Sequence, residues 1–141
     1  GLCQYGMIDF IIDHLDKFDI DSAHIEEIAS EITANTIYIP LDFCEDQFLS
    51  KYFCVIGRTP ARYLVKSPDG KRCFERAFIY NWIDRHHSDP LTRESLEKED
   101  LLECPEENAA ITERLQTLFA NKLSRQIAQR FASEEISTAT E

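Results

Sequence analysis

Residues 89–96 read Asp89-Pro90-Leu91-Thr92-Arg93-Glu94-Ser95-Leu96. An Asp-Pro step favours a loop, because proline fixes its own backbone angle and restricts the residue before it. The preceding residues predict a helix over 75–85, with an apolar side formed by Phe78, Ile79, Trp82 and Ile83. His86-His87-Ser88 ends this helix, and residues 97–100 begin a helical turn. The predicted order is therefore helix, loop and turn.

A β-hairpin is expected immediately before this helix. Residues 63–66 and 72–74 read as two short strands, and Ser67-Pro68-Asp69-Gly70 reads as the turn between them. Proline presets the dihedral angle that such a turn requires, and glycine accepts a positive φ. Gly57 and Pro60 interrupt the segment after Cys54, which indicates loops rather than a helix.

Helical patterns flank this region on both sides. They predict, in chain order, a helix over 7–18, a helix over 21–35, a helix over 42–53 and a last helix from about residue 106. Residues 36–39 are expected to be an extended connector, with a short edge strand as the alternative. The apolar stripe of the last helix comprises Ile111, Leu115, Leu118, Phe119, Leu123, Ile127 and Phe131. A frayed tail is expected from Ser133 onward.

The charge of the chain is negative and uneven. The formal net charge of −11 argues against general binding to nucleic acid or anionic lipid, because phosphate binding requires a cationic surface. Residues 1–50 carry eleven acidic side chains against the single Lys17, whereas residues 51–100 carry eight acidic and ten basic ones. This shift marks a boundary near residue 50. The acidic part is expected to be a solvated helical face, with a site for a basic partner as the alternative.

The five cysteines include no Cys-x-x-Cys pair. Their odd number and their spacing indicate neither a disulfide framework nor a zinc ribbon, so a reducing compartment is expected. No apolar run approaches the ~18–20 residues of a membrane span, and the start lacks the pattern of a secretory signal. A cytoplasmic protein without evident membrane association is expected. Because the chain begins with Gly1 rather than Met, we expect an excised or tagged segment.

The order of these features resembles a U-box, the zinc-free relative of the RING domain that recruits ubiquitin-conjugating enzymes. Members of that family typically carry Asp-Pro-x-Thr-x-x-x-Leu after their helix, and residues 89–96 match this pattern. The resemblance runs from Cys54 to Leu115. It also rests on Cys54-Val55-Ile56 for the opening, Gly70 with Phe74-Glu75-Arg76 before the helix, Trp82-Ile83 at its end, Glu99-Asp100-Leu101 for the short turn, and Asn108-Ala109-Ala110-Ile111 for the start of the last helix.

The resemblance implies an α+β fold. This fold is a small U-box or RING-like domain with a short β-hairpin, a central helix and two loops, without zinc. The domain is expected at residues 50–118. Helices within residues 1–49 and a long C-terminal helix flank it, and residues 119–141 extend that helix into the frayed tail. Residues 1–49 are expected to bind a substrate or partner, or to support the scaffold.

The resemblance further implies a U-box-type ubiquitin-protein ligase. A ubiquitin-conjugating enzyme carrying ubiquitin would dock on Ile56, Trp82 and Pro90. Arg93 would be the catalytic residue that bridges this enzyme and its ubiquitin. Transfer to an unidentified protein substrate would proceed by positioning, with no metal, no cofactor and no nucleophile of the ligase. The structural polar network that replaces metal ligands would comprise Glu75, Arg76, Asp89 and Thr92.

Several positions depart from the family pattern. Val55 replaces the family's proline, Tyr63-Leu64 replaces an acidic-Pro step, and one extra residue follows Gly70. Gly57-Arg58-Thr59-Pro60 also adds positive charge beside the expected docking site. These departures are expected to change which conjugating enzymes are accepted, or to prevent their binding.

Other functions compete with this interpretation. A noncatalytic protein-interaction adaptor with a degenerate U-box is the main alternative, and a homo-oligomer formed through the long apolar stripe is another. A divergent U-box with unfamiliar flanks also suits a bacterial effector in the cytoplasm of a host cell. Metal catalysis is not expected because His86-His87 lacks ligand spacing, and cysteine catalysis is not expected because Cys73 and Cys104 lack an argued base.

Overall fold

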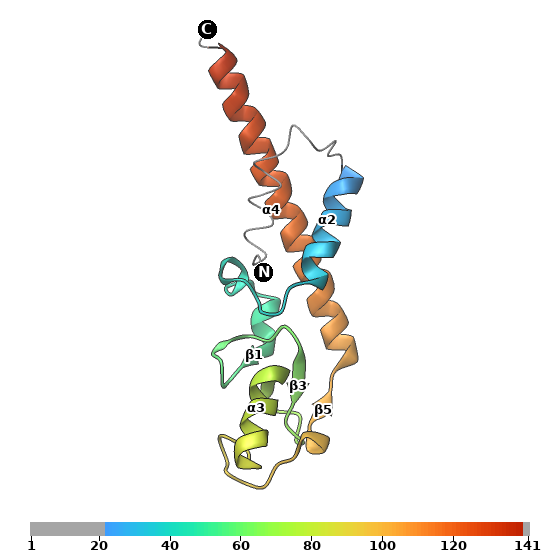
Figure 1. Cartoon of the computed structure of the whole chain (residues 1–141), viewed down its shortest axis with the longest axis vertical. Helices are drawn as coiled ribbons and strands as arrows, with labels where there is room; N and C mark the ends of the chain where they lie inside the picture. Colours follow the sequence, from blue (N-terminus) through green and yellow to red (C-terminus); the bar gives the residue numbers. More distant parts are fainter. Residues whose placement is uncertain (1–21, 140–141) are drawn as a thin grey trace. The chain divides into compact units, whose positions relative to one another are not determined.

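The computed structural model describes the backbone of residues 22–139 and the side chains of residues 24–129 (Figure 1). The chain divides into two compact units, of which one spans Ile37–Arg114. The described part of the other contains helix α2, Ser22–Ala34, and residues 115–139 of helix α4, Pro105–Ala139. Every site residue expected from the sequence lies in the Ile37–Arg114 unit.

A small sheet organises the loops of the Ile37–Arg114 unit. Its five strands lie in the order β2-β1-β4-β3-β5. The strands are β1 (Phe53–Cys54), β2 (Thr59–Pro60), β3 (Leu64–Lys66), β4 (Cys73–Glu75) and β5 (Leu102–Glu103). Neighbouring strands are antiparallel except β1 and β4, which pair in parallel. Because each strand has only two or three residues, the sheet serves chiefly to fix where the loops begin and end.

The expected hairpin is formed by β3 and β4. Val65 lies opposite Phe74, and the N–H of Gly70 donates to the carbonyl oxygen of Ser67 at 2.8 Å. Gly70 has a φ of 74°, a conformation in which a side chain would be strained. The glycine is therefore required by the turn, and the hairpin prediction is confirmed.

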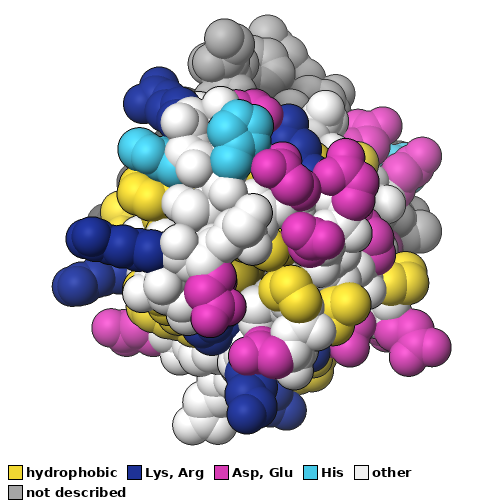
Figure 2. Space-filling view, turned by 90° about the horizontal axis from the view of Figure 1, so that it is seen from below, with side chains coloured by type: hydrophobic (Ala, Val, Ile, Leu, Met, Phe, Trp, Pro, Cys, Tyr) yellow, Lys and Arg dark blue, Asp and Glu magenta, His cyan; other side chains and the backbone are white. Residues whose placement is uncertain are grey.

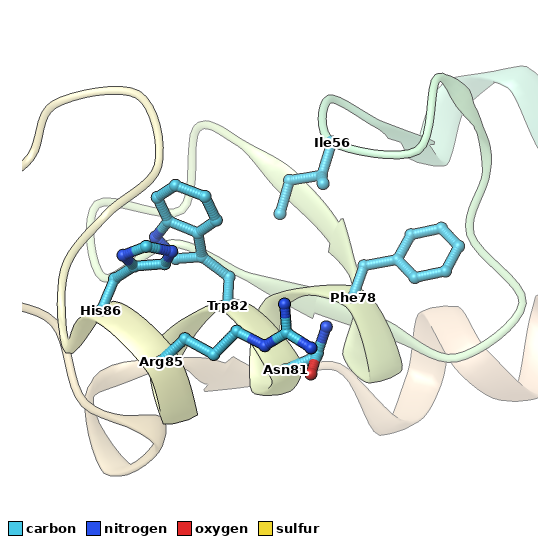
Figure 3. Close-up of a pocket in the computed structure, with 6 residues that line it drawn as sticks. All are labelled: Ile56, Phe78, Asn81, Trp82, Arg85 and His86. Atoms are coloured by element: carbon cyan, nitrogen blue, oxygen red, sulfur yellow. The ribbon is translucent and has the colours of Figure 1, made fainter.

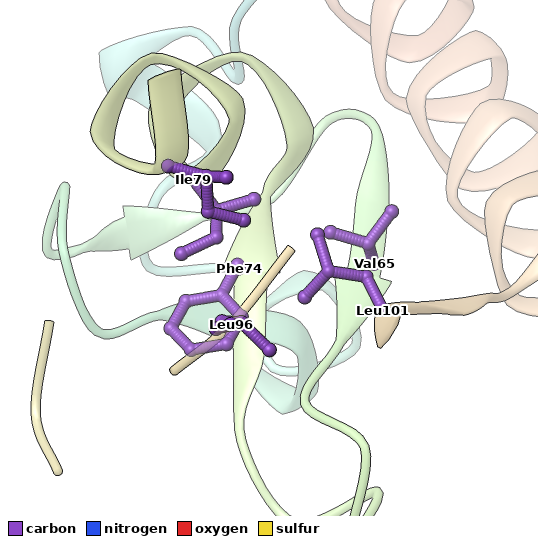
Figure 4. Packing of buried hydrophobic residues seen from close by; sticks show 6 residues of the cluster. Val65, Phe74, Ile79, Leu96 and Leu101 are labelled. Atoms are coloured by element: carbon purple, nitrogen blue, oxygen red, sulfur yellow. The ribbon is translucent and has the colours of Figure 1, made fainter. Parts of the chain in front are cut away.

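Helix α3, Arg76–His86, follows β4 directly and confirms the predicted central helix. His87 ends it in the left-handed conformation, and the N–H of His87 donates to the carbonyl oxygen of Ile83 at 2.8 Å. One side of α3 packs on the sheet and on the chain that follows the helix (Figure 4). The buried side chains that meet there, called the core cluster below, are Val65, Phe74, Ile79, Ile83, Leu96 and Leu101.

Residues 41–52 form two short 3₁₀ turns instead of the single helix expected over 42–53. The turns are η2 (Leu41–Phe43) and η3 (Leu49–Tyr52). Between them, the Asp46 carboxylate accepts hydrogen bonds from the N–H of Leu49 at 3.1 Å and from the guanidinium of Arg114 at 2.6 Å. A side chain that binds the local backbone competes with a continuous helix, so the prediction of one helix is wrong.

The start of helix α4 is tied to the sheet by Asn108. Its amide oxygen accepts the N–H of Leu64 at 2.7 Å, and its amide nitrogen donates to the carbonyl oxygen of Leu64 at 2.9 Å. One side chain thus satisfies both backbone groups of a β3 residue. Nearby, the guanidinium of Arg62 donates to the hydroxyl of Thr112 at 3.0 Å, which adds a second link to α4.

Both described helices of the second unit bury apolar side chains. α2 buries Ala29 and Ile32, and α4 buries Leu115, Phe119 and Leu123. The helix expected over 7–18 lies outside the described residues.

Two further expectations concern the connector and the tail. Residues 36–39 contain neither helix nor strand, as predicted. The helical backbone of α4 continues to Ala139, past Ser133, where a frayed tail was expected. Among residues 22–139, no helix is long and apolar enough to cross a membrane.

We expect Asn108→Ala to lower the free energy of unfolding by roughly 1–3 kcal/mol, because it leaves the backbone groups of Leu64 without their partner. Denaturant titration followed by circular dichroism measures this change. Asn121→Ala removes an exposed asparagine of the same helix and is expected to change the stability by less than about 0.5 kcal/mol. Equal effects of the two substitutions would contradict the role of Asn108.

Candidate functional site

A shallow hollow opens between α3 and the first loop, which we define as residues 55–63. Its volume is about 240 Å³. This hollow, called the α3 hollow below, is lined by Ile56, Phe78, Asn81, Trp82, Arg85 and His86 (Figure 3). The members from α3 recur mostly at intervals of three and four residues, which places them on one side of the helix. The hollow is therefore built by one helix face and one loop.

Two half-buried apolar side chains, Ile56 and Trp82, shape the α3 hollow. Both pack against the core cluster from outside. The indole N–H of Trp82 donates to the carbonyl oxygen of Ser88 at 2.8 Å. The centroids of the Trp82 and His86 rings lie 3.9 Å apart. Figure 3 shows Ile56 reaching from the first loop toward α3, with Trp82 and Phe78 on either side. A tryptophan held in this way presents a rigid apolar surface.

Gly57 permits the first loop to approach α3. A Cβ atom at this position would lie 2.3 Å from the Phe78 ring, which is far below van der Waals contact. The Phe78 ring is in turn stacked on Tyr38, with centroids 6.3 Å apart. The close contact between Gly57 and Phe78 therefore sets how near Ile56 lies to the helix.

The second loop, which we define as residues 87–97, is held by the buried carboxylate of Asp89. One oxygen accepts hydrogen bonds from the guanidinium of Arg72 at 2.7 Å and from the N–H groups of Leu91 and Thr92 at 2.7 and 3.1 Å. The other oxygen lies 2.5 Å from a second guanidinium nitrogen of Arg72. The Arg72 hydrogen bond, more than the backbone ones, lowers the pKa of Asp89 and keeps it ionised at neutral pH.

The first loop is held by a second buried carboxylate, that of Glu75. Its two oxygens accept hydrogen bonds from the N–H groups of Arg62 at 3.0 Å and Tyr63 at 2.7 Å. Burial raises the pKa of Glu75, although these hydrogen bonds act in the opposite direction. Glu75 and Asp89 thus each fix a different loop.

Arg76 and Thr92, the other two residues expected in the polar network, make separate contacts. The Arg76 guanidinium pairs with Glu103 of β5 at 2.5 Å. The Thr92 hydroxyl accepts the N–H of Glu94 at 3.3 Å, while the N–H of Thr92 donates to Asp89. The structure therefore brings Asp89 and Thr92 together in the second loop and places Arg76 beside the sheet.

Pro90 and Arg93 lie on the second loop and do not line the α3 hollow. Pro90 is half-buried and Arg93 is exposed. Arg93 has a φ of 63°, and its N–H donates to the carbonyl oxygen of Asp89 at 2.8 Å. This left-handed conformation costs a residue with a side chain roughly 1 kcal/mol or more. Within residues 24–129 the Arg93 guanidinium has neither an ion pair nor a hydrogen bond.

Sequence reasoning does not identify Arg72, Phe78 or Arg85 as site residues. Arg72 pairs with a residue 17 positions away, and no local pattern marks that pairing. Phe78 and Arg85 carry a usable signal, because they stand four residues before and three residues after Trp82 on the same helix face.

The chemistry available in the described part is that of a binding surface. Burial raises the pKa of the Cys73 and Cys104 thiols, so little nucleophilic thiolate is present at neutral pH. Among residues 24–129, no group of three or more His, Cys, Asp or Glu side chains is placed to hold a metal ion. The α3 hollow instead offers a fixed, partly exposed apolar surface between two pinned loops.

We expect Asp89→Ala to lower the free energy of unfolding by roughly 2–4 kcal/mol, because it leaves the Arg72 guanidinium and two backbone N–H groups without an acceptor. Since the pKa of Asp89 is lowered in the folded state, its contribution is complete above about pH 4 and is lost as the pH falls further. Urea unfolding at a series of pH values measures both effects. Glu99→Ala, at an exposed carboxylate, is the control and should change little. A difference between the variant and the wild type that persists undiminished at the lowest pH would contradict this account.

Comparison with known proteins agrees with this geometry. The family model of the U-box domain matches residues 50–118, which contain the sheet, α3, both loops and the start of α4. No curated protein matches the chain. The short hairpin, the central helix and the two loops confirm the predicted fold class. Residues 50–118 of this chain are therefore a U-box domain.

Proposed function

We propose that this chain is a ubiquitin-protein ligase. The U-box is a ubiquitin-ligase domain, and it occupies residues 50–118. The ligase binds a ubiquitin-conjugating enzyme that carries ubiquitin and promotes transfer to a lysine of a protein substrate. The observation that carries the proposal is the α3 hollow, in which Ile56 and Trp82 stand half-exposed beside a loop held by Asp89.

Ile56, Trp82 and Pro90 are the proposed contacts for the conjugating enzyme. Ile56 and Trp82 are supported by their shared hollow. Pro90 is supported by its place two residues after Ser88, whose carbonyl oxygen accepts the Trp82 indole N–H. A surface this small gives weak contact dominated by a few desolvated side chains, which suits an enzyme that must leave after each transfer.

Arg93 is the proposed bridge between the conjugating enzyme and its ubiquitin. Its planar guanidinium can donate to two carbonyl groups at once. It is exposed, and its loop is held in a costly left-handed conformation by the hydrogen bonds of Asp89. Strained residues of this kind concentrate at functional sites. The ligase then accelerates transfer by holding the thioester-linked ubiquitin in a reactive pose, without a nucleophile of its own.

Residues 1–49 and the extension over 119–141 are the proposed substrate-binding or scaffold-supporting parts. The stripe residues of α4 that are buried in the monomer are Ile111, Leu115, Phe119, Leu123 and Ile127. A homo-oligomer would therefore need a surface other than this part of the stripe. The proposed site of action is a cytoplasm, which would be that of a host cell if the protein is a bacterial effector.

A noncatalytic adaptor is the second candidate function. It is favoured by the first loop, where Val55 and Arg58 depart from the family pattern beside Ile56. In an adaptor the same hollow would bind a protein without promoting ubiquitin transfer.

We expect Ile56→Ala and Pro90→Ala to reduce autoubiquitination by roughly fivefold to thirtyfold, because truncating a dominant contact side chain costs about 1–2 kcal/mol of binding. The assay uses the full chain with a broad panel of conjugating enzymes, and circular dichroism confirms that each variant is folded.

Leu41→Ala is the matched control, since Leu41 is an exposed aliphatic residue of the same unit, 84% accessible, outside the hollow and the second loop. It should leave activity unchanged. Full activity of folded Ile56→Ala and Pro90→Ala proteins would contradict the proposed docking site, and inactivity of the wild type with every enzyme would favour the adaptor.

We expect Arg93→Gly to retain or slightly raise the stability, by up to about 1 kcal/mol, because glycine accepts the left-handed backbone. Discharge of ubiquitin from the loaded conjugating enzyme should fall roughly tenfold or more, because charge-assisted hydrogen bonds are lost. His87→Gly relieves a similar backbone strain, at a φ of 50°, and should keep its activity. A stable and fully active Arg93→Gly protein would exclude the bridging role.

A further inference from the structure

The α3 hollow contains no carboxylate, although the chain carries a net charge of −11. Its polar members are Asn81, Arg85 and His86. Figure 3 shows the Arg85 side chain running along α3 toward Asn81. The charge of the lining is therefore positive in an otherwise acidic protein.

Five of the eleven lysine and arginine side chains of the Ile37–Arg114 unit form an ion pair with an acid of the same unit. The pairs are Lys66–Glu107, Arg72–Asp89, Arg76–Glu103, Lys98–Asp84 and Arg114–Asp46. Arg58 and Arg85 have no such pair within residues 24–129. On the face shown in Figure 2, Lys and Arg predominate at the left and Asp and Glu at the right, so charge is also separated on the surface.

Arg58 lies on the first loop beside the hollow. It follows Gly57, whose backbone abuts the Phe78 ring, and it stands two residues after Ile56. Arg58 has a φ of 56°, and its N–H donates to the carbonyl oxygen of Cys54 at 2.9 Å. This backbone conformation favours glycine or asparagine over arginine. Within residues 24–129 the exposed Arg58 guanidinium has neither a hydrogen bond nor an ion pair that would offset this cost, which points to a partner outside the chain.

The ordinary explanation for cations at this end of α3 covers only part of the pattern. Arg85 and His86 lie in the last turn of the helix, where positive charge stabilises the helix dipole. Arg58 is outside any helix, so the dipole does not account for it. Nearby acids are also engaged, since Asp84 pairs with Lys98 and Glu97 pairs with His87.

We propose that Arg58 and Arg85 select the conjugating enzyme. They favour an enzyme that presents a carboxylate beside the apolar side chain entering the α3 hollow, and they reject one that presents a lysine or arginine there. This inference rests on the proposed ligase function and adds the chemistry of the partner that the hollow accepts.

Arg58 and Arg85 would select mainly by weakening the binding of an enzyme that presents a lysine or arginine to them. An exposed ion pair contributes at most about 1 kcal/mol to affinity, which corresponds to roughly fivefold. Two like charges placed face to face add a penalty, so the difference between two partners exceeds the gain from the favourable pair alone. The first-loop departures from the family pattern are then specificity determinants.

The test compares matched forms of one conjugating enzyme that binds the wild-type chain. One form carries glutamate and the other lysine at a docking-face position beside the inserted apolar side chain. We expect the wild-type chain to bind the glutamate form about fivefold to tenfold more tightly, and this preference to weaken as salt is added. The double variant Arg58→Glu/Arg85→Glu should reverse the preference. Lys71→Glu, at an exposed cation of the β3–β4 turn region, should leave it unchanged.

Ile56→Ala separates this inference from the proposed function, because it should weaken binding of both enzyme forms equally. If Ile56→Ala loses binding but the double variant keeps the wild-type preference for the glutamate form, charge selection is overturned. The proposed docking site is then still supported. A wild-type chain that binds no conjugating enzyme of a broad panel would overturn both proposals. Sedimentation could also show that the wild-type chain is a dimer and the double variant a monomer. That result would assign Arg58 and Arg85 to self-association and overturn the proposal.

Discussion

The buried carboxylate of Asp89 accepts hydrogen bonds from Arg72 and from two N–H groups of its own loop. Glu75 plays the same part for the first loop through the N–H groups of Arg62 and Tyr63. A carboxylate that accepts several short hydrogen bonds while shielded from solvent fixes the backbone far better than an exposed ion pair does. The positions of Ile56, Pro90 and every other side chain presented by the loops depend on these two acceptors.

Helix α3 connects this scaffold to the binding surface. Its inner side places Ile79 and Ile83 in the core cluster, while its outer side gives Phe78, Trp82 and Arg85 to the hollow. Because a packed core leaves little freedom to a short helix, the shape of the hollow is determined by contacts on the opposite side. The hollow is therefore preorganised by the same packing that stabilises the domain.

Local signals account for the parts of the fold that the sequence predicts. The turn at Pro68 and Gly70 and the helix over 76–86 follow from residues within a few positions of one another. The expected helix over 42–53 is wrong because Asp46 pairs with Arg114, 68 residues away. Strand β5 is missed because its partner strand β3 is also far away in the sequence. Ile56 and Trp82 are recognisable only through the family pattern, and Arg72 is recognisable only from the structure.

Trp82 is the only tryptophan of the chain. Its indole lies half-buried in the α3 hollow, against the ring of His86. The emission of an indole changes with its exposure to water and with the groups that touch it. The protein thus carries an intrinsic optical reporter at the surface where an enzyme would bind, and the occupancy of that surface can be followed in unlabelled protein.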